Sequence, residues 1–210
     1  MINPPPSPFP AVTCKVLPAG TELHRVHNRR FGPLDFNPGL GAPTRFAPLI
    51  DGSDTVATAY AAENLTCAIF ETILHDVVPN AAATVSWSHI EPLDHSHLKL
   101  KKPLRLAQLF APDLSALGLT RGQLIDTPPS EYPHTAAWAY ALQKANHHVA
   151  GLIWTSRACD PHWATILFGH RFSSLHDHFE LVEQTPIGDC DDRLNEVRLA
   201  CLRIKASIAF

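Results

Sequence analysis

The segment spanning residues 56–78 constrains the fold most, because it changes from a strand pattern to a helix pattern within a few residues. Val56, Thr58 and Tyr60 alternate with alanine, and this period of two is typical of a strand whose second face lies close to another layer. Asn64 then provides a side chain suited to cap a helix. We therefore predict a strand that ends at Tyr60 and a helix that begins just after Asn64.

The predicted helix carries apolar side chains around most of its circumference. At about 100° per residue, these positions leave almost no face for solvent. They are Leu65, Cys67, Ala68, Ile69, Phe70, Ile73 and Leu74. Glu71 interrupts this surface, and His75 follows one turn later. Because a buried carboxylate is costly unless it is paired or lines a cleft, Glu71 is the first residue that requires an explanation.

The length and composition predict one domain. A chain of 210 residues with 45% apolar and 18% charged residues can bury a core and lacks the charge excess of disordered chains. The proline-rich start predicts an extended N-terminal arm over residues 1–19, which leaves residues 20–210 for the domain. Strands and helices do not alternate regularly, so the predicted fold class is α+β, with a split or mostly antiparallel sheet.

The later part of the chain predicts several further elements. We expect strands at residues 85–90 and 104–110, separated by a polar turn region at residues 95–99. A C-terminal helix is expected at about residues 191–209. The other expected elements are helices at 112–117 and 135–147 and strands at 150–154, 164–168 and 179–182.

Charge and cysteine usage exclude several classes of partner and site. The net charge of -3 argues against direct nucleic-acid binding, and five well-separated cysteines argue against a disulfide framework. No stretch approaches the roughly 18 continuous apolar residues of a membrane span. We therefore expect a cytoplasmic protein that does not bind membranes.

The most irregular part of the chain lies between two arginines. Three glycines and three prolines between residues 31 and 43 predict a long loop, with Arg25 before it and Arg45 after it. Arg29 and Arg30 complete a local basic cluster, which is enough for a small anionic ligand. Such loops carry function more often than packing, although a mobile surface loop is the alternative.

Common catalytic motifs are missing from the sequence. Thirteen histidines include no helical His-Glu-x-x-His spacing, and no nucleophile elbow, dinucleotide fingerprint or phosphate loop is present. The candidates that remain are Arg25, Arg45, Tyr60, Glu71 and Ser156. Arginine binds phosphate, tyrosine offers a flat face to a ring, and a carboxylate stabilises positive charge at an anomeric carbon. This set suits a dinucleotide whose glycosidic bond is broken, but it also suits a core ion pair beside a packed tyrosine.

Several motifs in the chain resemble the RES-domain family. They occupy residues 23–26, 30–38, 44–46, 58–63, 70–76 and 154–157, and the resemblance covers about residues 20–172. It implies a fold similar to that of ADP-ribosyltransferases. It also implies a toxin that degrades NAD and is neutralised by a Xre-type antitoxin. The sequence leaves open whether the chain forms a homo-oligomer or a hetero-oligomer with the antitoxin.

The resemblance also implies roles for the five candidates. Arg25 and Arg45 would hold the pyrophosphate of NAD, and Tyr60 would stack on or wall the nicotinamide. Glu71 would bind the ribose hydroxyls and stabilise the transition state, and Ser156 would orient ribose or phosphate. NAD is then the substrate, inorganic phosphate or water is the acceptor, and no metal or other cofactor is required. Two departures from the family pattern are His24, which replaces an aromatic residue, and the tail beyond Phe172.

Two other functions fit the same motifs. The first is mono-ADP-ribosyltransfer to a protein target, which uses the same fold and substrate. The second is a non-catalytic module that binds NAD without turnover. Labelled NAD separates these from NAD degradation, since transfer leaves label on protein and a binding module leaves NAD unchanged.

Overall fold

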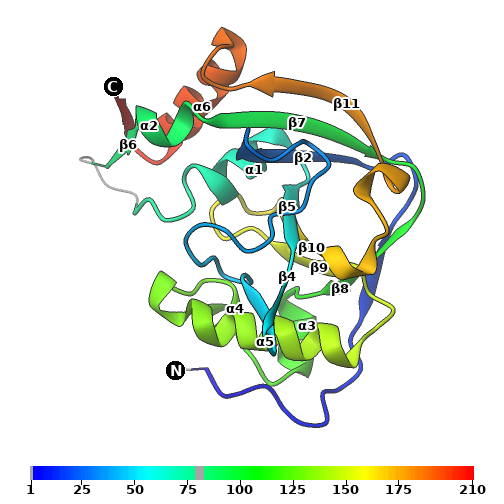
Figure 1. The fold of residues 1–210 in the computed structure, drawn as a ribbon. Helices are drawn as coiled ribbons and strands as arrows, with labels where there is room; N and C mark the ends of the chain where they lie inside the picture. Colours follow the sequence, from blue (N-terminus) through cyan, green and yellow to red (C-terminus); the bar gives the residue numbers. More distant parts are fainter. Residues whose placement is uncertain (1, 79–82) are drawn as a thin grey trace.

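The computed structural model describes residues 2–78 and 83–210, and an eight-stranded mixed sheet forms its centre (Figure 1). The strands follow the spatial order β1-β8-β9-β10-β5-β2-β7-β11. Neighbours run antiparallel except β8 and β9, which are parallel. The strands are β1 (Cys14–Leu17), β2 (Glu22–Asn28), β5 (Thr58–Ala62), β7 (Leu93–Leu100), β8 (Leu104–Gln108), β9 (Gly151–Thr155), β10 (Trp163–Phe168) and β11 (Phe179–Pro186).

The sheet is split between β5 and β2. These strands pair only at His24 opposite Ala62, whereas β2 pairs with β7 along its whole length. Beyond that point Thr58 of β5 forms a bridge with Asn37, so the loop after β2 occupies the place that the strand would have taken. The expected α+β domain with a split, mostly antiparallel sheet is confirmed.

Helices and short strands complete the fold. Figure 1 shows α3, α4 and α5 together at one end of the molecule, and α2, α6 and the C-terminus at the other. The α-helices are α1 (Leu65–Thr72), α2 (Trp87–Ile90), α3 (Ala111–Ala116), α4 (Arg121–Leu124), α5 (Tyr132–Ala145) and α6 (Asp191–Arg203). The short strands are β3 (Leu49–Asp51), β4 (Asp54–Val56), β6 (Thr84–Ser86) and β12 (Ser207–Ala209), and 3-10 turns occur at Pro129–Glu131, Gly169–Arg171 and Leu175–Asp177. No helix among the described residues has the length and apolar character needed to cross a membrane.

Apolar cores cover both faces of the sheet. Along β9, Leu152 and Trp154 join one core while Ile153 joins the other, as the alternation of a strand requires. The first core also contains α1, whose residues Cys67 to Phe70 are buried in succession. The helix is therefore buried nearly all round, as its sequence predicts.

The prediction for the central segment is right at the start of the helix and wrong at both bounds of the strand and at the end of the helix. The Asn64 side chain accepts a hydrogen bond of 2.8 Å from the Cys67 amide and caps α1 as expected. The strand, however, ends at Ala62 rather than Tyr60, and Val56 belongs to a separate hairpin strand. Helix α1 ends at Thr72, so His75 lies in the turn after the helix.

Other expectations need correction too. The polar turn region at residues 95–99 is the middle of β7, where Ser96 bonds His27 of the neighbouring strand and His95 bonds His24. The strand expected at 85–90 is β6 followed by α2, and the C-terminal helix ends at Arg203, before β12 pairs in parallel with β6. The N-terminal arm contains β1, which pairs with β8 at the edge of the sheet. Cross-strand polar partners and distant strand pairing decide these segments, and neither is visible in a local pattern.

Candidate active site

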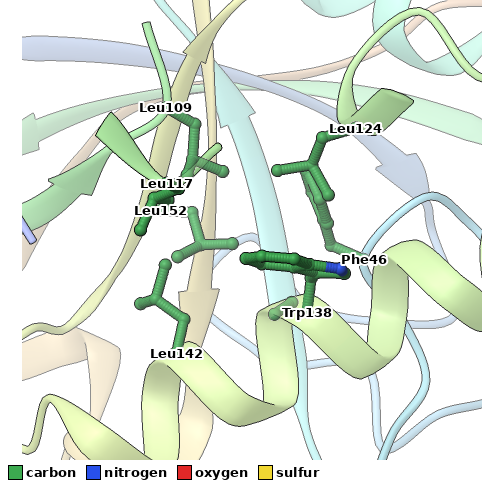
Figure 2. Close-up of a pocket in the computed structure, with 8 residues that line it drawn as sticks. Phe46, Leu109, Leu117, Leu124, Trp138, Leu142 and Leu152 are labelled. Carbon is green, nitrogen blue, oxygen red and sulfur yellow. The ribbon is translucent and has the colours of Figure 1, made fainter. Parts of the chain in front are cut away.

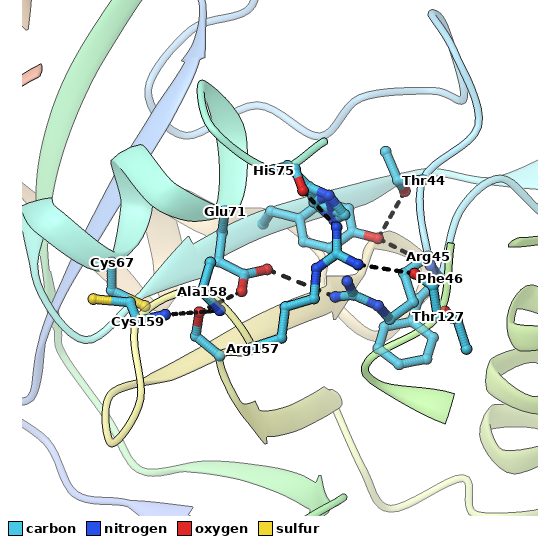
Figure 3. A network of polar contacts seen from close by, with 12 residues as sticks. Thr44, Arg45, Phe46, Cys67, Glu71, His75, Thr127, Arg157, Ala158 and Cys159 are labelled. Carbon is cyan, nitrogen blue, oxygen red and sulfur yellow. Dashed lines mark hydrogen bonds and ion pairs between the residues drawn. The ribbon is translucent and has the colours of Figure 1, made fainter. Parts of the chain in front are cut away.

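Glu71 in the last turn of α1 is the centre of a buried polar cluster (Figure 3). Its Oε1 accepts a hydrogen bond of 2.6 Å from the Ser156 hydroxyl, and its Oε2 lies 3.8 Å from Nη1 of Arg45. The Glu71 side chain is 8% exposed, and the Arg45 side chain is 2% exposed. The structure therefore brings a carboxylate, a guanidinium and a hydroxyl together from three distant parts of the chain.

Arg45 has more hydrogen-bond donors than the surrounding protein satisfies. Its Nε and Nη2 are buried and have no hydrogen-bond partner among the described residues. Burial lowers the pKa of Arg45, and the carboxylate of Glu71 acts against this shift. Because buried donors normally have partners, two unpaired nitrogen atoms on one buried guanidinium indicate a place for the oxygen atoms of an anionic ligand.

Tyr60 holds the segment that carries Arg45. Its hydroxyl shares a hydrogen bond of 2.8 Å with the Thr44 hydroxyl and accepts one of 3.3 Å from the Phe46 amide. Burial raises the pKa of Tyr60 to about 12, so the phenol keeps its proton at neutral pH. In addition, the carbonyl of Arg45 accepts a hydrogen bond from Thr135 of α5. The backbone of Arg45 is therefore fixed from both β5 and α5.

Ser156 is fixed by the turn that follows β9. Its hydroxyl oxygen accepts hydrogen bonds of 3.3 and 3.1 Å from the amides of Ala158 and Cys159. With both amides donating to the oxygen, the hydroxyl proton is directed to Glu71. Ser156 is fully buried, and its main role in this arrangement is to orient the carboxylate.

The cluster includes two residues that the sequence prediction did not place in the site. His75 lies after α1, and its Nδ1 is 3.2 Å from Asp76 Oδ1; burial lowers the pKa of its imidazole. Arg157 donates hydrogen bonds of 2.5 Å to the His75 carbonyl and 3.0 Å to the Thr127 carbonyl. Two features of the sequence pointed to these residues: His75 follows Glu71 by about one helical turn, and Arg157 comes directly after Ser156.

Arg25 lies apart from this cluster. On β2 it shares a face with Leu23, which belongs to the second core, whereas α1 packs in the first. Its guanidinium donates hydrogen bonds of 2.6 Å to the Pro33 carbonyl and 3.1 Å to the Asp35 carbonyl. Burial lowers the pKa of Arg25 to about 10. The structure thus brings together Arg45, Tyr60, Glu71 and Ser156, and it places Arg25 against the loop.

Two cavities lie outside the cluster. The apolar one in Figure 2 lies beside α5 and is too narrow for a water molecule. It is lined by Phe46, Leu109, Leu117, Leu124, Trp138, Ala139, Leu142 and Leu152, and it is a gap in the core. A second cleft of about 330 Å³ is lined by residues of the β3–β4 hairpin, the end of α5 and the turn after β10. Arg45, Glu71 and Ser156 line neither of these two cavities.

Comparison with known proteins supports one family. The family model described as the RES domain matches residues 22–188. A chain of the crystal structure of the M. tuberculosis MbcT–MbcA toxin–antitoxin complex has a similar fold, with a TM-score of 0.56 and 12% sequence identity. The similarity covers 81% of this chain and 85% of that chain. No curated protein sequence matches the chain significantly.

Proposed function

This chain belongs to the RES-domain family, and from that membership we propose that it is a toxin enzyme that degrades NAD. The proposed reaction breaks the bond between nicotinamide and ribose, with phosphate or water as the acceptor. A Xre-type antitoxin would neutralise it. The similarity in fold to a chain of a toxin–antitoxin complex supports the toxin assignment.

The observation that carries the proposal is the pairing of Glu71 with a buried arginine that has unpaired donors. Glu71 is oriented by Ser156, and Arg45 keeps Nε and Nη2 without partners among the described residues. A carboxylate beside an anion-binding guanidinium suits a substrate that joins a pyrophosphate to a ribose carrying a cationic leaving group. NAD is such a substrate.

In the proposed mechanism, the bond from the anomeric carbon to the nicotinamide nitrogen breaks first. Its electron pair goes to the pyridinium ring, which leaves as neutral nicotinamide. The Glu71 carboxylate stabilises the positive charge that develops on the ribose. An oxygen of phosphate or water then bonds to the anomeric carbon, and water loses a proton in doing so. Since the leaving group is neutral, the reaction needs no metal.

The remaining residues position the substrate in this proposal. Arg45 binds the pyrophosphate, and Tyr60 holds the Thr44 to Phe46 segment through its hydroxyl while its ring lies at the nicotinamide side. Ser156 keeps the Glu71 carboxylate in place. Arg25 contributes by holding the loop after β2, because its donors are bonded to the carbonyls of Pro33 and Asp35.

The test is NAD consumption by the purified protein with and without phosphate, with the products identified by mass. Phosphorolysis gives nicotinamide and phosphorylated ADP-ribose, and hydrolysis gives nicotinamide and ADP-ribose. Both should continue in excess chelator. Label from NAD that becomes attached to protein would indicate ADP-ribosyltransfer instead, and bound but unchanged NAD would indicate a binding module.

A further inference from the structure

Arg157 spans two walls of the candidate active site. Its Nη2 bonds the carbonyl of His75, after α1, and its Nη1 bonds the carbonyl of Thr127, before α5. The charged partner nearest to it is Asp76, at 3.7 Å, and that side chain is 57% exposed. The guanidinium of Arg157 is therefore held mainly by neutral acceptors and has only a weak, solvated counter-ion.

Arg157 also places a second positive charge beside Arg45. Figure 3 shows the two guanidinium groups next to each other, with Glu71 directed towards them. Because the two cations are close, the charge of Arg157 adds to the burial that lowers the pKa of Arg45. Glu71 is the buried carboxylate of this cluster and Asp76 is solvated, so the two guanidinium groups share one buried counter-charge.

Arg157 also differs from Arg45 in its exposure. The Arg157 side chain is 25% exposed, whereas that of Arg45 is 2% exposed. A ligand arriving from solvent can therefore reach Arg157 first. A charged phosphate oxygen is a stronger acceptor for guanidinium than a neutral carbonyl, so a phosphate can compete with the two carbonyls for Arg157.

We propose that Arg157 is the second phosphate-binding residue of the site, acting with Arg45 in the role that the sequence motifs assign to Arg25. On binding, it exchanges the carbonyls of His75 and Thr127 for phosphate oxygens. This inference deepens the NAD-degrading function proposed above and rests on it for the identity of the natural substrate.

The phosphate oxygens have two sources in that reaction, the pyrophosphate of NAD and inorganic phosphate. The first experiment does not depend on turnover and uses pyrophosphate and inorganic phosphate as probes at constant ionic strength. Isothermal titration compares the wild type with Arg157→Gln and Arg157→Lys. For whichever probe the wild type binds more tightly, we expect Arg157→Gln to reduce the affinity about 10- to 100-fold. This is the effect of losing a charge-assisted hydrogen bond. The affinity of Arg157→Lys should lie between those of the wild type and Arg157→Gln, because lysine keeps the charge but lacks the planar guanidinium.

The matched control is Arg193→Gln. The Arg193 side chain is 22% exposed, close to the 25% of Arg157, but it lies on a different part of the surface and is paired at 2.8 Å with a carboxylate, Glu183. This variant should bind both probes like the wild type. If Arg157→Gln does not fold, Arg157→Lys carries the test, provided that its melting temperature stays close to that of the wild type.

A second experiment separates the two sources by NAD turnover. If Arg157 binds the pyrophosphate of NAD, Arg157→Lys raises KM for NAD in phosphate-free buffer. If it binds inorganic phosphate, the variant instead raises the phosphate concentration needed for half-maximal rate. Unchanged probe affinities in the Arg157 variants, or a wild type that binds neither probe, would overturn the inference. Probe binding that needs Arg157 in a protein that does not consume NAD would support the inference and reject the proposed function.

Discussion

The Ser156 hydroxyl donates a hydrogen bond of 2.6 Å to Oε1 of Glu71, across 85 positions of the sequence. A short bond between a hydroxyl and a carboxylate is charge-assisted and fixes the orientation of both groups. The other carboxylate oxygen lies 3.8 Å from Arg45, which is too long for a tight ion pair. Glu71 is therefore anchored by Ser156 and keeps its second oxygen available on the side of Arg45.

We predict that Glu71→Gln lowers both turnover and stability. The amide cannot balance the positive charge on the ribose, so NAD turnover should fall by about two orders of magnitude or more. It also leaves Arg45 without its buried counter-charge, which should reduce the free energy of unfolding by about 3 kcal/mol. NAD binding should largely persist, because the arginines are intact. Melting curves and NAD turnover on the same preparation measure these effects.

Glu63→Gln is the control for this variant. Glu63 precedes α1 and pairs with His162 at 2.8 Å, with its side chain 39% exposed. Loss of this exposed ion pair should change the free energy of unfolding by less than about 1 kcal/mol and leave NAD turnover unchanged. Normal specific activity in the folded fraction of Glu71→Gln would mean that Glu71 is part of a structural ion pair only.

Arg45→Lys should weaken NAD binding while the protein still folds. Lysine preserves a positive charge near Glu71, but it cannot make the parallel hydrogen bonds of a guanidinium. We expect a loss of about 1.5 to 3 kcal/mol in binding free energy, measured by titration with NAD. Arg29→Lys, at an exposed arginine paired with Asp94, should bind NAD normally. Equal affinities in wild type and Arg45→Lys would remove Arg45 from the site.

Arg25→Met should act on folding more than on chemistry. The substitution removes two hydrogen bonds from a charged group to the loop carbonyls of Pro33 and Asp35, so we expect stability to fall by about 3 kcal/mol. Limited proteolysis should cut the loop faster than in the wild type. A variant with an unchanged melting temperature and abolished NAD affinity would show that Arg25 contacts the substrate directly, as the family resemblance implies.

Acid should destabilise the protein through the histidines between β2 and β7. His24 and His95 share a hydrogen bond of 2.9 Å, and burial lowers their pKa values to about 4 and about 3. In the unfolded chain both histidines have a pKa of about 6.5. Between about pH 6.5 and pH 3, the unfolded state therefore binds more protons than the folded state. Stability is then fully present above about pH 6.5 and falls as the pH decreases towards 3.

The variant that isolates this effect is His95→Gln. Glutamine can still bond His24 but does not titrate, so the loss of stability between pH 7.5 and 4.5 should shrink by about 2 kcal/mol. Urea unfolding at both pH values measures the difference. A variant with the same acid sensitivity as the wild type would show that other groups dominate.

Local patterns predicted the parts of the fold and site that local interactions determine. The Asn64 cap, the buried α1 and the strands at β9 and β10 all follow from short-range capping and apolar periodicity. The burial of Glu71 was likewise visible, because a carboxylate in an apolar helix is evident from its neighbours.

The parts that were missed depend on partners far away in the sequence. β7 appeared to be a turn because its polar side chains find partners only across the sheet, as Ser96 does with His27. Arg25 and Arg45 looked equivalent as arginines on either side of one loop, yet strand alternation places Arg25 on the face opposite α1. Only the three-dimensional arrangement distinguishes an arginine that holds a loop from one that faces a carboxylate.

The single pairing of β2 with β5 has a consequence for how the molecule unfolds locally. Since the two parts of the sheet share so little backbone hydrogen bonding at this seam, α1 and the bridge from Asn37 to Thr58 carry much of the connection between them. In native-state hydrogen exchange, the amides on either side of the seam should form separate cooperative units, with the Asn37–Thr58 bridge opening before the ladder of β2 and β7. A ligand held between α1 and the loops would slow that opening, so its occupancy could be read from the exchange rate of amides that it does not touch.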